Sequence, residues 1–399
     1  MITALDMLAV ASTPPKYTFT QVLEAYGWVA AVSFAVSAAA TPAVRALALR
    51  LKIVDKPDGF LKPHQRPIAY GGGIGVYLGW VAGMIVLLPR IDPGRTWVLG
   101  LTISSGVVLA VGLADDLFDI KPKLKLAGQV LAAAVLLAFG IGQDVFLLIL
   151  QSLQVFWPAI TCPQWLVLAL SVPMTILLVV ATCNATNLLD GMDGLCTGVT
   201  GIISVMFLLL ATHLAMYAYS EPTDQVRVVV ALAMAGAVCG FLPYNFSPAT
   251  IFLGDAGSML LGFFAAAMML MFGERGIVRW VLGAVMIFGL PILDTSLALI
   301  RRIRLGHPIF SGDRSHLYDQ LVDRGFSVNQ TVAICYGLSI FYGLTGLAII
   351  LIRTRYAFVI YPAVAAVTFY LCHRWGFLKP PQETPLEYAG EAPDRSPDS

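Results

Sequence analysis

Runs of about 20 mostly apolar residues recur along this 399-residue chain, and they constrain its fold more than any other feature. Only α-helices and closed β-barrels cross a bilayer, because every backbone polar group must be paired there. A barrel would show short alternating strands instead. Charged residues make up only 12% of the chain, against about 25% in a soluble domain. The chain is therefore predicted to be an all-α polytopic membrane protein.

Eleven apolar runs are predicted to span the membrane as helices. They lie near 25–46, 70–88, 96–113, 125–142, 165–186, 196–217, 227–243, 250–272, 278–303, 328–352 and 356–373. Residues 144–163 are expected to be an interfacial segment. This division leaves a short extracytoplasmic segment at 1–24, a single transmembrane domain at 25–373, and a tail at 374–399. The composition of the tail, rich in Pro, Glu, Asp and Ser, predicts disorder.

The distribution of lysine and arginine predicts the orientation. With the N-terminus outside, most of the 25 basic residues fall in the loops after the first, third and ninth spans and in the tail. The positive-inside rule places these segments in the cytoplasm. Each aspartate-rich motif described below then lies on that same side. The net charge of +1 gives no bulk attraction to nucleic acid, and no nucleic-acid partner is expected.

The stretch 184–195 reads Asn-Ala-Thr-Asn-Leu-Leu-Asp-Gly-Met-Asp-Gly-Leu and separates two apolar runs. Ionisable groups at the end of a membrane helix are costly and usually mark a functional site. If the stretch is helical, Asn187, Asp190 and Asp193 fall on roughly one face. Neighbouring carboxylates repel each other unless a cation offsets their charge. The stretch is therefore interpreted as half of a metal and phosphate site at the membrane surface.

A second acidic motif, Asp115-Asp116-Leu-Phe-Asp119, ends the third span, and three lysines including Lys125 follow it. If the motif is helical, Asp119 faces both earlier acids. Carboxylates suit Mg²⁺, which takes one or two of them together with substrate phosphate. Lysines suit the remaining phosphate charge. Helix-end capping and membrane anchoring stay open as the alternative.

Asp255 is the only acid in the apolar stretch from Val228 to Phe272, about one turn into the eighth span. An isolated buried carboxylate becomes neutral unless it is paired or bound to a metal. Phe252 is expected one helical turn away, where it either stacks on a base or packs against lipid and core.

Two further cytoplasmic loops, those after the first and the ninth span, also carry basic residues. In the first, Lys62 and His64 either contact phosphate or belong to an ordinary basic loop of the kind the positive-inside rule predicts. In the last, His307 and His316 lack the i, i+4 spacing of a helical zinc pair, which disfavours a zinc hydrolase. Asp294, within the ninth span, has either a pairing or a catalytic role.

Taken together, three aspartate clusters and basic residues without a serine or cysteine nucleophile motif indicate Mg²⁺-assisted phosphoryl transfer. The membrane location makes sense if the acceptor is a lipid phosphate whose tail lies between helices. A soluble donor would approach from the cytoplasm.

Five motifs, in this order, resemble the polyprenyl-phosphate N-acetylhexosamine-1-phosphate transferase superfamily. They are Lys62-Pro-His64-Gln-Arg-Pro with Gly71-Gly72, Asp115-Asp116-Leu-Phe-Asp119 with Lys125, the stretch 184–195, Asn245 through Phe252-Leu-Gly-Asp255-Ala-Gly-Ser, and Phe310-Ser-Gly-Asp313-Arg314-Ser-His316-Leu. The resemblance covers about residues 55–325. It implies Mg²⁺ (with Mn²⁺ as a substitute), a UDP-amino-sugar donor, an undecaprenyl phosphate acceptor and release of UMP. It also implies a multi-pass protein of the bacterial cytoplasmic membrane, with a homodimer as an option.

The resemblance further implies roles for individual residues. Asp255 and Asp115 resemble metal ligands, and Asp115 also resembles the base toward the lipid phosphate or the nucleophile. The remaining catalytic positions are Asp116, Asp190, Asp193 and His316. The substrate-binding positions are Lys62, His64, Lys125, Asn187, Asn245, Phe252 and Arg314, with Phe252 stacking on uracil.

The last loop bears on the subfamily. It reads His316-Leu-Tyr318-Asp319, without the run of histidines followed by Phe-Glu that muramoyl-pentapeptide transferases carry. The loop and the expected eleven spans favour the GlcNAc-1-phosphate branch, although that branch usually has further histidines, so the amino sugar stays open. The non-enzyme alternative is an ion or phosphate transporter, which predicts acids along a path through the bilayer midplane.

Overall fold

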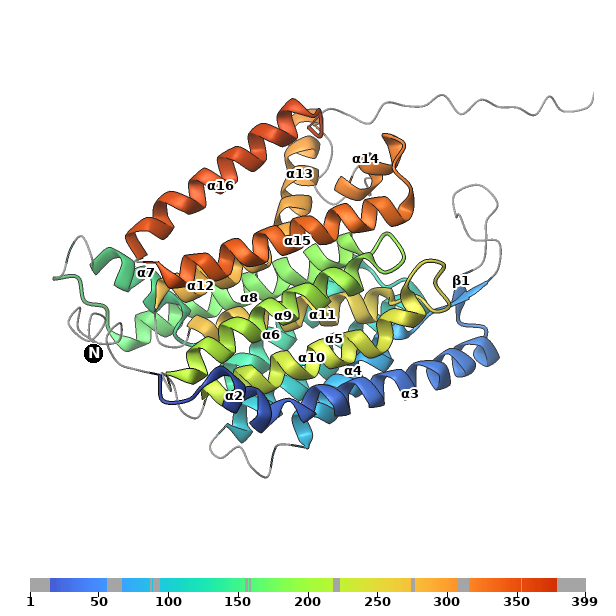
Figure 1. The fold of residues 1–399 in the computed structure, drawn as a ribbon, viewed down its shortest axis with the longest axis horizontal. Coiled ribbons are helices and arrows are strands. Elements are labelled where there is room, and N and C mark those ends of the chain that lie inside the picture. Colours follow the sequence, from blue (N-terminus) through green and yellow to red (C-terminus); the bar gives the residue numbers. More distant parts are fainter. Residues whose placement is uncertain are drawn as a thin grey trace, which may run out of the picture.

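The computed structural model describes residues 15–55, 67–86, 88, 94–154, 157, 159–217, 223–273, 277–306, 316–352 and 354–378. Helices make up nearly all of this part of the chain, and most of them run alongside one another as one elongated bundle (Figure 1). The all-α polytopic fold expected from the sequence is confirmed.

Among the described residues, eight helices are long and apolar enough to cross a membrane. They are α3 (Trp28–Leu51), α5 (Arg95–Phe118), α8 (Gln164–Leu189), α9 (Leu195–Met216), α10 (Thr223–Asn245), α11 (Gly254–Gly273), α15 (Val328–Leu351) and α16 (Thr354–Arg374). The shorter helices are α2 (Phe19–Tyr26), α4 (Gly72–Ile85), α6 (Pro122–Ala138), α7 (Val145–Gln154), α12 (Val278–Ile287), α13 (Gly289–Leu305) and α14 (Leu317–Asp323).

The ninth expected span, 278–303, is not one straight helix. It breaks at Phe288, and α12 and α13 meet there at an angle of 69°. Pro291 explains the break, because its ring would clash with the carbonyl of Ile287, the last residue of α12. Counting this bent pair as one span gives up to nine in the described residues. Since α4 and α6 have only 14 and 17 residues, the count of eleven stays a prediction.

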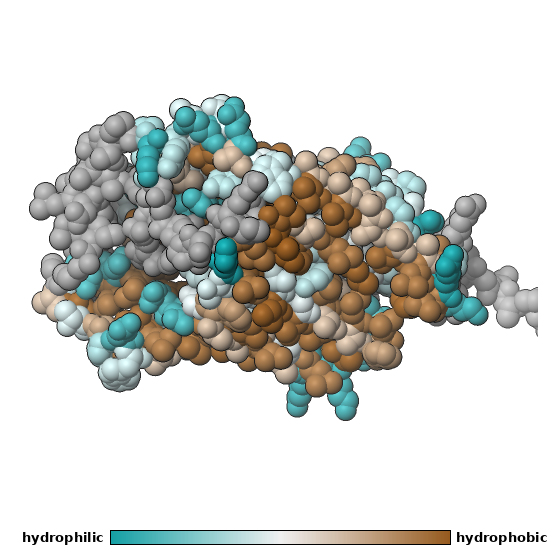
Figure 2. All heavy atoms as spheres, turned by 90° about the horizontal axis from the view of Figure 1, so that it is seen from below, coloured by the Kyte–Doolittle hydropathy of each residue, from teal (hydrophilic) through white to brown (hydrophobic). Residues whose placement is uncertain are grey.

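The centre of the bundle is α11, whose most apolar 18-residue window is completely buried. Small residues along α11 let neighbouring helices approach closely, as is usual inside membrane bundles. By contrast, only 11% of the corresponding window of α16 is buried. Figure 2 shows the consequence on one face: hydrophobic residues cover its middle, and hydrophilic residues lie mainly toward its edges.

One end of the bundle is called the acid end here, because it carries Asp115, Asp116, Asp190 and Asp255. It lies to the right in Figure 1, near β1 and α14. At this end β1 (Val54–Asp55) pairs antiparallel with β2 (Ile68–Ala69). Ala69 also forms a parallel bridge with Ile251, just before α11. The segment that leads into α4 is thus tied to the segment that leads into α11.

Candidate active site

Three of the predicted motifs meet around Asp255 and Lys125, the latter near the start of α6. The Lys125 Nζ lies 2.8 Å from Oδ2 of Asp115, at the end of α5, and also forms a salt bridge with Oδ2 of Asp255, at the start of α11. From α8, the Asn187 side-chain amide donates to Oδ1 of Asp255 at 2.8 Å and to Oγ of Ser258 at 3.0 Å. Four helices therefore supply one connected cluster, and the expected convergence of these residues is confirmed.

Asp116 holds the helix that carries Asp255. Its two carboxylate oxygens accept the backbone N–H groups of Asp255, at 2.8 Å, and of Ala256, at 3.2 Å. A carboxylate at a helix N-terminus satisfies otherwise unpaired N–H groups and complements the helix dipole. Gly254 makes this contact possible: its φ is +74°, and a Cβ there would lie 2.7 Å from Asp116 Oδ2. Asp255 lies in the first turn of α11 rather than one turn inside a span.

The stretch around Asp190 is a turn, so the expected single helical face of Asn187, Asp190 and Asp193 is wrong. The reason is that α8 ends at Leu189 and α9 begins at Leu195, as the two glycines between them favour. Asp193 turns away and accepts the backbone N–H of Ala249 at 2.9 Å.

Asp190 nevertheless lies with the other acids. Burial raises the pKa of its carboxyl well above the ordinary value, and the negative charges of Asp255, Asp116 and Asp193 raise it further. Asp115, Asp190 and Asp255 are thus gathered at one end of the bundle. The transporter alternative, which predicted acids along the midplane, does not match this arrangement.

Asp119 does not share a helical face with Asp115 and Asp116 as expected. α5 ends at Phe118, and Asp119 is exposed with a φ of 47°, in the left-handed region. Pro122 begins α6 and prevents α5 from continuing.

Phe252 is not one helical turn from Asp255, because the chain before α11 is not helical. Its N–H donates to the Ala69 carbonyl at 2.8 Å, and its own carbonyl accepts from the Gly72 N–H at 2.9 Å. The Phe252 ring lies 5.8 Å from the ring of Tyr70, centroid to centroid.

Asn245 is buried within the framework of the acid end. Its side-chain oxygen accepts from the Thr197 hydroxyl at 2.7 Å, and its amide donates to the Ile251 carbonyl at 3.2 Å. The structure therefore gives Asn245 a part in holding the segment that carries Phe252.

His316 is buried and paired with Asp294. Its Nδ1 lies 2.8 Å from Asp294 Oδ2, and Asp294 Oδ1 accepts the Leu317 N–H at 2.6 Å. Of the two roles that the sequence left open for Asp294, the structure shows the pairing role, in which it anchors the start of α14.

α14 packs against the end of α8. The Tyr318 ring stacks on that of His316, with centroids 5.5 Å apart, and its hydroxyl donates to the Leu188 carbonyl at 3.1 Å. A side chain at Gly191 would collide with Tyr318, which accounts for the glycine next to Asp190. His316 is thereby held beside the Asp190 turn.

The first residues of the expected tail pack onto α13 and α14. Arg301 donates to the Phe377 carbonyl at 3.0 Å, and so does Gln320 at 3.2 Å. The Arg324 guanidinium lies 4.1 Å from the centre of the Phe377 ring. Residues 379–399 lie outside the described residues.

Lys62, His64 and Arg314, and also His307, lie outside the described residues too. Their phosphate-binding roles, where expected, stay predictions.

A polar pair without a predicted role, Asn184 and Gln129, lies one helical turn from the cluster. Asn184 donates from its side-chain amide to Gln129 Oε1 at 2.9 Å. Gln129 is buried on α6, four residues after Lys125, and its Nε2 has no hydrogen-bond partner among the described residues. A polar residue inside an apolar span was the available signal.

The residues present fit a Mg²⁺ ion shared with substrate. In the part of the chain that the structure describes, no group of three or more Asp, Glu, His or Cys side chains is arranged to hold a metal. However, Asp115 and Asp255 converge on a single cationic group, the Lys125 ammonium. Mg²⁺ is usually bound through one or two carboxylates plus substrate phosphates, and these two carboxylates match that donor set.

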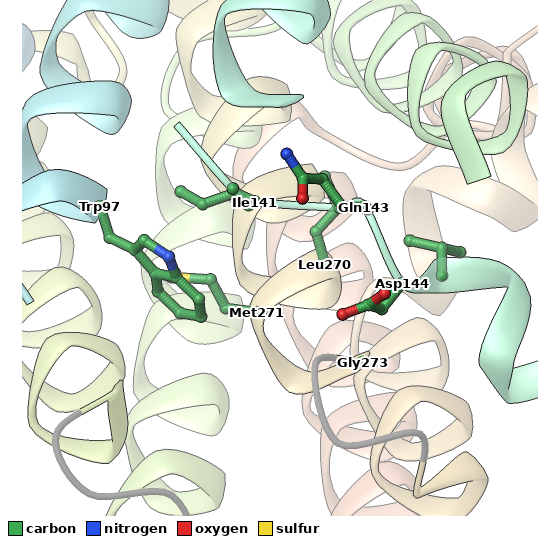
Figure 3. Close-up of a pocket in the computed structure, with 10 residues that line it drawn as sticks. Trp97, Ile141, Gln143, Asp144, Leu270, Met271 and Gly273 are labelled. Carbon is green, nitrogen blue, oxygen red and sulfur yellow. The ribbon is translucent and has the colours of Figure 1, made fainter. Parts of the chain in front are cut away.

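A small pocket lies at the end of the bundle opposite the acid end (Figure 3). It is lined by Trp97, by residues 140–145 and by Leu270, Met271 and Gly273 of α11. Its volume of about 10 Å³ is that of a single water. A helix rises about 1.5 Å per residue, so the pocket lies roughly 25 Å from Asp255 along α11. It is not the substrate site.

The fold and the site define a polytopic helical membrane protein in which carboxylates and a lysine meet at one end of the bundle. A model of glycosyl transferase family 4 matches residues 98–273, which include that cluster. A decaprenyl-phosphate N-acetylglucosaminephosphotransferase of Mycobacterium tuberculosis is 33% identical over 319 residues, covering 74% of this chain and 76% of the relative.

Two further relatives carry related names. A probable undecaprenyl-phosphate N-acetylglucosaminyl 1-phosphate transferase of Bacillus subtilis is 27% identical, over 77% of this chain and 80% of its own length. An undecaprenyl-phosphate alpha-N-acetylglucosaminyl 1-phosphate transferase of Escherichia coli is 28% identical, over 73% and 74%. The chain belongs to glycosyl transferase family 4, within the polyprenyl-phosphate N-acetylhexosamine-1-phosphate transferase superfamily. The resemblance stated from the motifs is confirmed.

Proposed function

We propose that this protein transfers N-acetylglucosamine-1-phosphate from UDP-N-acetylglucosamine to a polyprenyl phosphate and releases UMP. The observation that carries the proposal is the meeting of Asp115, Asp255 and Lys125, from three helices, at one end of a membrane bundle. The names of the relatives support the same class of acceptor and of transferred sugar.

In the direct form of this reaction, an oxygen of the lipid phosphate attacks the donor phosphorus that bears the sugar. A new P–O bond forms while the bond from that phosphorus to the bridging oxygen breaks, and the bridging oxygen leaves as part of UMP. Phosphoryl transfer of this kind depends mainly on positioning and on electrostatic stabilisation. A cluster with both carboxylates and a lysine at a membrane helix end suits these needs.

Asp255 and Asp115 would hold Mg²⁺, or Mn²⁺ in its place, together with the donor diphosphate. When bound, the ion would neutralise part of the phosphate charge. Asn187 keeps the Asp255 carboxylate oriented through Oδ1, and Asp116 keeps its backbone in place. Lys125 is placed to contact phosphate as a point charge.

Asp115 acts either as the base that takes a proton from the lipid phosphate or as a nucleophile that attacks the sugar-bearing donor phosphorus, expels UMP and then yields the sugar phosphate to the lipid. The two options differ in whether a covalent phospho-enzyme forms, and trapping that species distinguishes them. The other assignments place the donor: Asp190 and Asp193 at the diphosphate and nucleotide, Phe252 and Asn245 at the uridine, His316 in the last loop, and Lys62, His64 and Arg314 at phosphate.

We also propose that the acid end faces the cytoplasm and that the N-terminus lies outside, following the basic residues in the sequence. This orientation gives a nucleotide sugar direct access to the acid end. The lipid acceptor would reach the same cluster from the bilayer. A homodimer remains compatible with these assignments.

The test uses purified protein in detergent with radiolabelled UDP-sugars, a polyprenyl phosphate, and either Mg²⁺ or EDTA. We expect labelled lipid product with UDP-N-acetylglucosamine in Mg²⁺ and none in EDTA. Exclusive use of UDP-MurNAc-pentapeptide would instead support the muramoyl-pentapeptide alternative and overturn the proposed donor.

The matched variants are Asp255→Asn and Asp144→Asn. Both remove one carboxylate charge, but Asp144 lies at the pocket of the opposite end. We expect the first variant to lose transfer while remaining folded, and the second to retain it. Wild-type turnover by Asp255→Asn would contradict the metal assignment.

A further inference from the structure

Tyr70 lies at the acid end in a backbone that is fixed on both sides. Its N–H donates to the Ile53 carbonyl at 3.1 Å. The residue before it, Ala69, accepts from the Phe252 N–H at 2.8 Å and bridges to Ile251. Tyr70 is therefore held to the same strand-like framework as Phe252, and its side chain has a defined starting direction.

The Tyr70 ring packs beside the Phe252 ring. Their centroids are 5.8 Å apart and their planes are inclined by 59°, a tilted aromatic contact. Tyr70 is only partly exposed. Two aromatic rings thus lie next to the start of α11, whose first turn carries Asp255.

The Tyr70 hydroxyl lies in the field of the acids. Burial raises the pKa of Tyr70 to about 12, and the charges of Asp55, Asp116, Asp255 and Asp190 add to the shift. The phenol is consequently protonated at neutral pH and is a hydrogen-bond donor. Within the described residues this hydroxyl makes no hydrogen bond, unlike that of Tyr318, which donates to a backbone carbonyl. Among the described residues, nothing therefore uses the hydroxyl as a hydrogen-bond donor.

We propose that Tyr70 binds the nucleotide sugar, and that its hydroxyl donates a hydrogen bond to the diphosphate of that substrate. This inference rests on the proposed function. A phenol hydroxyl can donate a hydrogen bond to an anionic ligand without adding charge to the site. The neighbouring carboxylates, when ionised, can only accept hydrogen bonds. The ring contact with Phe252, three residues before Asp255, keeps the Tyr70 ring next to the start of α11.

The experiment compares Tyr70→Phe with wild type, because this change removes one oxygen and keeps the ring. The KM for UDP-N-acetylglucosamine should rise by about tenfold or more, as expected for losing a hydrogen bond to a charged group. The KM for the polyprenyl phosphate should not change. Tyr77→Phe is the control, since the Tyr77 hydroxyl reaches only the Thr102 carbonyl, at 3.4 Å, on α5.

Direct calorimetric binding of UDP-N-acetylglucosamine, without lipid, separates this inference from the proposed function. Weaker binding to Tyr70→Phe than to wild type and Tyr77→Phe supports the inference whether or not transfer is observed. Equal dissociation constants overturn it and leave Tyr70 a packing partner of Phe252. A rise in the KM for the lipid alone also overturns it, because the hydroxyl would then serve the acceptor. Loss of transfer by wild type from every UDP-sugar would refute the proposed function instead.

Discussion

The Asp116 carboxylate accepts the backbone N–H of Asp255 at 2.8 Å, although the two residues are 139 positions apart. This hydrogen bond makes the end of α5 the cap of α11, so the position of the Asp255 side chain depends on Asp116. The two neighbouring acids of α5 therefore differ in what they hold: Asp115 pairs with Lys125, and Asp116 holds a helix terminus.

Replacing Asp116 by alanine should destabilise the fold as well as lower activity. Loss of an N-cap side chain costs about 0.5–2 kcal/mol. Thermal unfolding in detergent should show a lower midpoint for Asp116→Ala than for Asp115→Ala, which removes the same charge but no helix cap. Asp116→Asn should lie between wild type and Asp116→Ala, because it retains one acceptor oxygen. Equal midpoints for the two alanine variants would contradict the capping role.

Removing the Lys125 charge should strengthen binding of a divalent cation in the absence of substrates. Its ammonium lies between two carboxylates, where it competes with a metal ion. Unit charges 4 Å apart interact with about 4 kcal/mol at an effective dielectric constant of 20, so a tenfold gain in affinity is a modest expectation. Electron paramagnetic resonance titration with Mn²⁺ measures it for Lys125→Met.

Lys121→Met is the control for that titration, because Lys121 is exposed immediately before α6, the helix that carries Lys125. Its Mn²⁺ affinity should match that of wild type. Weaker binding to Lys125→Met would show that the lysine organises the carboxylates for the metal rather than competing with it. Turnover of Lys125→Met should fall in either case, since the lysine also serves the phosphate.

Sequence reasoning found the acids of the site because charged residues at the ends of apolar runs are costly and therefore informative. It placed Asp115, Lys125, Asn187 and Asp255 together correctly, since the ends of membrane helices on one side share one surface. What failed was local geometry. The assumption of continuous helix put Asp119, Asp193 and Phe252 on helical faces, but each lies beyond a helix end.

The contacts that no sequence pattern predicted join segments that are far apart in the sequence. Asp116 caps α11 only because the three-dimensional fold brings two distant helix ends together. The Asp294–His316 pair likewise joins two segments whose separation carries no periodic signal. Tyr70 had a weaker signal, an aromatic residue next to the glycines that precede α4. Pro291 could have predicted the bend at Phe288, but the apolar run 278–303 is long enough for one span and was interpreted as one straight helix.

The contact between Phe377 and Arg324 predicts that the segment after α16 stabilises α14. The Arg324 guanidinium lies over the Phe377 ring, while Arg301 donates to the Phe377 carbonyl. Phe377→Ala should lower the unfolding midpoint, because it removes the ring and its cation–π contact, worth about 0.5–1 kcal/mol at exposed sites and more when desolvated. The loop joining α13 and α14 should also become easier to cleave in limited proteolysis.

Tyr370→Ala is the control for Phe377→Ala, because Tyr370 is an exposed aromatic residue on α16. Its loss should leave the rate of cleavage between α13 and α14 unchanged. Equal cleavage rates for the two variants would show that the segment after α16 does not hold α14.

The stability of the α14 region should depend on pH through Asp319. Burial raises the pKa of this carboxyl to about 6, although the charge and the backbone N–H of His316 oppose the shift. In an unfolded chain the pKa is about 3.9. Because the folded state holds the proton more tightly, the stabilisation is fully present below about pH 4 and is lost as pH rises through about 6.

Asp319→Asn removes this titration while keeping an acceptor for the His316 N–H. The unfolding midpoint of wild type minus that of Asp319→Asn should therefore fall between pH 4 and pH 6.5 and stay constant above that range. Thermal unfolding in detergent at half-unit steps of pH measures the difference. A wild-type advantage that grows with pH would mean that the Asp319 carboxylate is stabilised by its partners more than it is penalised by burial.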